Sequence, residues 1–197
     1  MGNAVEMTLR GQGFVARRAF LAAILACAVC GSPRAQQGEP GTPSDAIRFF
    51  AHEKSAAEQY AVILATIGKN NVATYVRGIK LYADAKAEFD GLIAELRFDL
   101  QNGQQPSNSV KFNEALKAAA EKRVAFTSFV SEEIDKLQGA RPGLPDVIQA
   151  VPELVKAITV AGLSVWKAFH EAAAEQRNAI LNELERLQWR SFADLAK

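Results

Sequence analysis

Three cationic side chains stand at otherwise apolar positions and have the clearest potential for chemistry in this chain. Lys54, Lys86 and Arg123 each interrupt a run, here called a seam, in which apolar residues recur at steps of three and four. The three seams consist of Ile47, Phe50, Ala57, Ala61 and Leu64; of Tyr75, Ile79, Tyr82, Phe89, Ile93, Leu96 and Leu100; and of Phe112, Leu116, Ala119, Phe126, Val130 and Leu137. Folding consecutive helices onto one another near residues 69–70 and 105 places the three side chains at one height. Unpaired cations in a low-dielectric interior are costly, so such a cluster needs an anionic partner. The pattern therefore predicts a binding site for a small anionic ligand or cofactor.

The simpler explanation of the three cations is structural. Their alkyl stems can line the apolar seam while the charged ends reach solvent or pair with Glu58, Asp90 or Glu88. In that case the three residues stabilise the fold and bind no ligand.

The remaining residue types form no catalytic or metal-binding pattern. Paired metal ions in helical bundles need Glu-x-x-His motifs, whereas His52 and His170 each directly precede a glutamate, and adjacent residues point to different helix faces. The sequence also lacks a Gly-x-Ser-x-Gly nucleophile motif and a glycine-rich phosphate loop. We therefore predict a non-enzymatic protein with no metal ion and no cofactor of its own.

The charge balance argues against nucleic acid as a partner. The chain of 197 residues has 23 basic and 22 acidic residues, a net charge of +1, which creates no attractive field for phosphates. The closest basic and aromatic stretch, residues 185–192, contains Arg186 and Arg190 but begins with a glutamate. We interpret Trp189 and Phe192 in it as a helix end that folds onto the other helices.

The N-terminus has the three-part layout of a secretory signal peptide. Arg10, Arg17 and Arg18 precede ten apolar residues, Phe20–Val29, and a polar stretch rich in proline and glycine follows. Ten apolar residues are too few to span a bilayer about 30 Å thick. The alternative is a buried N-terminal helix of the fold. The layout predicts a signal peptide over residues 1–35, a linker over residues 36–43 and a domain over residues 44–197.

Residues 17–21, Arg-Arg-Ala-Phe-Leu, resemble the twin-arginine export signal. Ala16 and Ala22 depart from that pattern, so a general secretory signal stays open as the export route. Either route implies an exported protein. Removing residues 1–35 takes away four basic residues and one acidic residue, which leaves 19 and 21 and a net charge of −2.

Cys27 and Cys30 have the spacing of a redox pair, but both lie in or at the end of the apolar run, and the next residue is Gly31 rather than the histidine of a haem-attachment motif. Residues 24–27, Ile-Leu-Ala-Cys, resemble a bacterial lipobox, which implies acylation of Cys27 and a lipid anchor. Removal of Cys27 with the signal peptide is the alternative. The expected location is therefore the periplasm, either free or as a membrane-anchored lipoprotein.

The rest of the chain predicts an all-α fold. Helix signals define spans of about 43–67, 72–100 and from a cap at Ser107 or Ser109 to about 137, each ended by Gly, Asn or Pro. The remainder to about residue 195 is predicted to be helical, with a bend near Pro152 or Gly162. The repeat of about 3.5 residues is typical of coiled-coil-like packing, and short connections favour an antiparallel, up-down-up-down four-helix bundle.

Residues 147–169 form the most apolar stretch of the domain. Charged residues and Pro152 interrupt it, so we predict no transmembrane helix there. It fits a core helix, a face that docks a protein partner, or a membrane-active segment.

These observations favour a non-enzymatic binding or scaffolding module of the bacterial envelope, with a protein partner. A carrier of a small anionic ligand within the bundle is the alternative, and a membrane-active protein using residues 147–169 is the second.

Overall fold

The structure is a computed structural model that describes residues 43–68, 71–139 and 147–197, all of them within one compact unit, Gly38–Lys197. Regular structure in these ranges is entirely helical, which confirms the all-α prediction. The predicted signal peptide, the linker up to residue 42 and Cys27 lie outside the described residues.

The first three long helices agree with the predicted spans to within one residue. They are α2 (Pro43–Ile67), α3 (Val72–Gln101) and α4 (Val110–Gln138). Side chains cap two of them: Asn71 accepts the Thr74 N–H at 3.1 Å, and Ser109 accepts the Phe112 N–H at 3.2 Å. These caps satisfy backbone donors that have no partner within their own helix.

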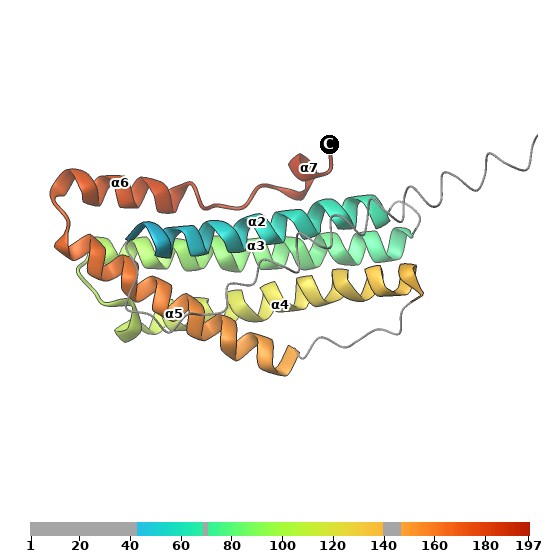
Figure 1. Cartoon of the computed structure of the whole chain (residues 1–197), viewed down its shortest axis with the longest axis horizontal. Helices are drawn as coiled ribbons and strands as arrows, with labels where there is room; N and C mark the ends of the chain where they lie inside the picture. Colours follow the sequence, from blue (N-terminus) through green and yellow to red (C-terminus); the bar gives the residue numbers. More distant parts are fainter. Residues whose placement is uncertain (1–42, 69–70, 140–146) are drawn as a thin grey trace, which may run out of the picture. The chain divides into compact units, whose positions relative to one another are not determined.

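The long helices pack side by side, α3 along α4 and α5 (Val147–Glu171) against both α2 and α4 (Figure 1). The predicted apolar seams supply about half of the core, 15 of the 32 buried apolar residues in the described ranges, and their members Tyr75 and Ile79 are only half-buried. Leu137 is an exception, because it lies in the last turn of α4 with 59% of its surface exposed. The buried seam residues are Ile47, Phe50, Ala57, Ala61, Leu64, Tyr82, Phe89, Ile93, Leu96, Leu100, Phe112, Leu116, Ala119, Phe126 and Val130.

The C-terminal third differs from the prediction. Helix α5 is continuous through Pro152 and Gly162, so the helical C-terminal part is interrupted at neither residue, and the bend expected there stays a prediction. Gly162 allows close packing, since a Cβ at this position would lie 3.1 Å from the ring of Phe112. The chain turns at residues 172–173 and continues as α6 (Ala174–Glu185) and, after a non-helical stretch, α7 (Phe192–Leu195).

The turn after α5 has a tertiary cause. Ile180 and Leu184 of α6 are buried, and α6 lies against α2, α3 and α5. Burial of these side chains outweighs the local preference for one continuous helix, because packing routinely overrides intrinsic propensity.

Helix α5 contains the apolar stretch 147–169. Ile158, Ala161, Val165 and Phe169 are buried, whereas Val160 is 54% exposed. No helix in the described ranges is both long enough and apolar enough to cross a membrane.

Candidate functional site

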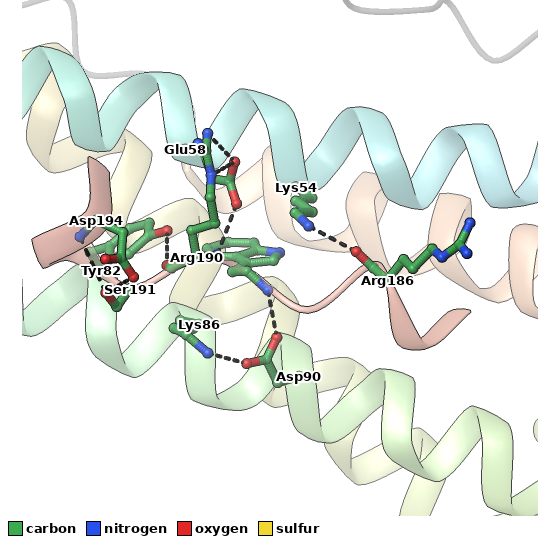
Figure 2. A network of polar contacts seen from close by, with 10 residues as sticks. Lys54, Glu58, Tyr82, Lys86, Asp90, Arg186, Arg190, Ser191 and Asp194 are labelled. Carbon is green, nitrogen blue, oxygen red and sulfur yellow. Dashed lines mark hydrogen bonds and ion pairs between the residues drawn. The ribbon is translucent and has the colours of Figure 1, made fainter. Parts of the chain in front are cut away.

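The C-terminal segment of residues 186–192, here called the strap, runs between α2 and α3 and contacts side chains of both helices (Figure 2). The set of contacting residues is here called the groove: Lys54 and Glu58 from α2, and Tyr82, Phe89 and Asp90 from α3. Residues 186–191 of the strap lie outside the α-helices. The N–H groups of residues 186–188 bond to carbonyls of α6, whereas those of Trp189 and Arg190 need partners from elsewhere.

Two carboxylates of the groove accept backbone N–H groups of the strap. Asp90 Oδ1 accepts the N–H of Trp189 at 3.0 Å, and Glu58 Oε1 accepts the N–H of Arg190 at 2.9 Å. Hydrogen bonds to ionised acceptors are about twice as strong as neutral ones. Consecutive residues of the strap are therefore fixed to opposite walls of the groove.

Two donors of the groove bind carbonyl groups of the strap. Lys54 Nζ donates to the carbonyl of Arg186 at 2.9 Å, and the Tyr82 hydroxyl donates to the carbonyl of Arg190 at 2.8 Å. Burial and the neighbouring Glu58 carboxylate raise the pKa of Tyr82, which keeps its hydroxyl a donor. The groove thus recognises main-chain atoms, which every amino-acid sequence presents.

Aromatic side chains supply the apolar part of the site. Trp189 is 3% exposed, with its ring centroid 5.0 Å from that of Phe89 and 5.7 Å from that of Tyr82. Phe192 packs edge-on against Tyr75 and Tyr82. The Trp189 Nε1 has no hydrogen-bond partner among the described residues, so this pocket holds an aromatic ring without using the indole N–H.

The arginine of the strap pairs with a buried acid. Arg190 donates from Nε and Nη2 to Glu58 Oε2 at 3.0 and 2.9 Å, and the hydrogen bond and charge of Glu58 raise the pKa of Arg190. The Glu58 side chain is 8% exposed, whereas that of Arg190 is 61% exposed. A cation at this strap position neutralises an acid that is buried once the strap is in place.

Two of the three predicted ligand-binding residues belong to this site. Lys54 contacts the strap directly, and Lys86 forms an ion pair with Asp90, the acceptor of the Trp189 N–H (Figure 2). The pairing of Lys86 with Asp90 was one of those expected from the sequence. Glu58 instead pairs with Arg190 of the strap.

Arg123 belongs to a different contact, between α4 and α2. Its Nε lies 3.5 Å from Glu53 Oε2, and burial lowers the pKa of Arg123 while the charge of Glu53 opposes that shift. Each of the three cations therefore has a protein partner. The small-anion site at Lys54, Lys86 and Arg123 stays a prediction, and an anion there would compete with those partners.

Sequence reasoning anticipated the strap but missed the groove. Trp189 and Phe192 were expected to fold onto the helices, and both do so. The roles of Glu58 and Asp90 were not predicted as peptide contacts. Their only sequence signal is that acids on two helices lie next to seam positions, which is common on solvated helix faces.

The two histidines contact residues that are close to them in the sequence. His52 approaches its neighbour Glu53, and His170 stacks on Trp166 and contacts its carbonyl oxygen at 3.0 Å. Among the residues that the structure describes, no three His, Cys, Asp or Glu side chains are grouped as metal ligands would be.

The chain matches no protein-family model, no curated protein and no solved structure.

Proposed function

We propose that this chain is an exported, non-enzymatic interaction protein of the bacterial envelope, whose groove between α2 and α3 binds extended protein segments. The observation that carries this proposal is that side chains of α2 and α3 bind four main-chain groups of the strap. Three of these groups belong to Trp189 and Arg190, which lie outside any helix, and the fourth is the carbonyl of Arg186 at the end of α6. Side chains that bind both N–H and C=O groups of a non-helical segment can serve as a peptide-binding site.

The side-chain contacts define the preferred segment as an aromatic residue followed by arginine. The aromatic residue fills the pocket of Tyr82 and Phe89, and the arginine pairs with Glu58. Because the pocket leaves the indole N–H of Trp189 unpaired, a phenylalanine at this position loses no hydrogen bond. The strap is then an internal occupant that a partner segment displaces.

The scaffold in this proposal is an antiparallel four-helix bundle of α2 to α5. Contacts of α3 with α4, of α5 with α2 and α4, and of α2 with α3 support it. The resemblance of residues 1–35 to an export signal, with or without acylation of Cys27, supports a periplasmic location, in which the groove would meet other envelope proteins.

A labelled peptide of residues 186–197 tests the proposal on the full chain. The wild-type groove is filled by its own strap at an effective concentration of about 1 mM, so it competes with added peptide. We expect the Trp189→Ala/Arg190→Ala double variant, whose own strap is weakened, to bind the peptide with a Kd of roughly 10 µM, or about −7 kcal/mol, by fluorescence anisotropy.

Adding Glu58→Gln to that double variant is the matched control, and it should weaken peptide binding about tenfold or more through loss of a charge-assisted contact. Circular dichroism establishes that the variants stay helical. If the double variant loses its helices, Arg190→Glu replaces it, since the exposed guanidinium is not part of the core. A helical, strap-weakened chain that binds no peptide at 1 mM, about the effective concentration of the strap itself, contradicts the proposal.

A further inference from the structure

The turn between α5 and α6 occurs where the local sequence favours a helix. Helix α5 ends at Glu171 and α6 begins at Ala174, and the residues between them are Ala172 and Ala173. Alanine is the strongest helix former, and residues 163–197 contain neither glycine nor proline. Backbone preference therefore favours one straight helix through this turn.

Side chains of α6 hold the turn in place. Gln176 accepts the N–H of Ala173 at 3.2 Å, and Arg177 donates to the carbonyls of Phe169 and His170 at 2.9 and 3.1 Å. In a continuous helix these two carbonyls would accept the N–H groups of residues 173 and 174. Arg177 thus supplies, in the bent form, the hydrogen bonds that the backbone would supply in a straight one.

The segment beyond the turn, residues 174–197, here called the arm, is held mainly at its far end. Only Ile180 and Leu184 of α6 are buried, whereas the strap has the aromatic and polar contacts of the groove. All groove residues precede the turn in sequence, so a second copy of the chain offers the same groove to the same arm.

We propose that two copies of this chain exchange their arms to form a dimer. In the dimer, α5 and α6 of each copy join into one straight helix, and the strap of each copy occupies the groove of the other. The contacts of the strap are reproduced across the interface while the backbone of residues 172–174 gains its preferred conformation. This inference rests on the proposed docking groove and names a second copy as its partner.

The Ala174→Pro substitution is compatible with the bent monomer and incompatible with the straight helix of the dimer. Ala174 is the first residue of α6, where proline is favoured, and Ala173 before it has φ −66° and ψ 162°, which a following proline accepts. In the straight helix the same proline removes a backbone hydrogen bond and clashes with the preceding turn. The variant should therefore stay monomeric, with Ala174→Ser as a control that permits both forms.

Sedimentation of the full chain at increasing concentration measures the fraction of dimer that arm exchange should produce. We expect the wild-type and Ala174→Ser chains to show a growing dimer fraction after equilibration near the unfolding transition, and Ala174→Pro to show none. Arg177→Gln should strengthen dimerisation about a hundredfold, since each of the two copies loses roughly 1.4 kcal/mol of bent-form stabilisation, a factor of ten per copy.

Charge reversal establishes that the arms are exchanged. A chain with Glu58→Arg and a chain with Arg190→Glu each place like charges in their own groove, so neither docks its strap well alone. In the mixture, the Glu58→Arg groove can bind the Arg190→Glu strap of the other chain. The unchanged groove of the Arg190→Glu chain can bind the unchanged strap of the Glu58→Arg chain, so opposite charges meet in both grooves. We expect a one-to-one heterodimer only in the mixture.

A wild-type chain that stays monomeric at every concentration, or an Ala174→Pro chain that dimerises like the wild type, overturns the exchange. The peptide experiment distinguishes the two proposals. Peptide binding without any dimer refutes the exchange alone, whereas failure of peptide binding refutes the docking groove and the exchange together.

Discussion

Replacing Glu53 with glutamine is expected to lower the free energy of unfolding by about 3 kcal/mol, because it leaves the buried Arg123 without a countercharge. The two side chains are only 16% and 11% exposed, so water cannot take the place of the lost carboxylate. Urea unfolding followed by circular dichroism measures the change.

The paired control is the double substitution Glu53→Leu/Arg123→Met. Replacing a buried ion pair with apolar residues of similar volume is often neutral or stabilising, so this variant should regain most of the stability that Glu53→Gln loses. Equal stability of Glu53→Gln and the wild type would show that Arg123 reaches water or another anion, contrary to its burial in this structure.

Replacing Trp189 with alanine should destabilise the chain by about 3 kcal/mol, near the lower end of the range for a buried tryptophan. The loss is limited by the free energy with which the strap docks, because the strap can detach while the long helices stay packed. Thermal or urea unfolding gives the magnitude.

Trp189→Phe is the matched control for this prediction. It keeps a ring against Tyr82 and Phe89 and removes only an N–H that has no partner in the described part of the chain, so it should lose far less stability than alanine. If alanine and phenylalanine have the same small effect, the ring is not held in the groove.

The sequence was sufficient for the helices whose signals are local. The spans of α2 and α4 follow from Pro43 and Ser109 at their starts, and the span of α3 follows from the Asn and Gly residues on either side of it. Apolar residues at helical spacing support all three spans. Burial of Phe50, Tyr82 and the other seam residues followed from the same periodicity. Leu137 fits the same periodicity but is exposed, because it lies in the last turn of its helix. Periodicity alone does not show where a helix leaves the core.

The turn at residues 172–173 could not be predicted, because its alanines favour a helix and its causes lie elsewhere in the chain. Arg177 and the groove residues Glu58 and Asp90 act across separations of 7 to 132 residues. Single-sequence reasoning identified Lys54 and Lys86 as unusual because they break an apolar pattern. It could not identify the strap as their neighbour, since that requires the path of the chain after α6.

The same gap between local preference and tertiary structure underlies the arm-exchange proposal. A turn made by glycine or proline would be fixed by its own residues, whereas this turn depends on Arg177 and on docking of the strap. In the proposal, a partner segment or a second copy that displaces the strap therefore also allows α5 and α6 to join into one helix.

The central claim is that the groove binds the backbone of the strap, and hydrogen exchange at the N–H groups of Trp189 and Arg190 in the full chain tests it most directly. Both N–H groups are bound by buried or half-buried carboxylates, so we expect exchange about a hundredfold slower than in the free peptide of residues 186–197. Exchange of both groups at the rate of the free peptide would show that the strap is undocked and would contradict the account.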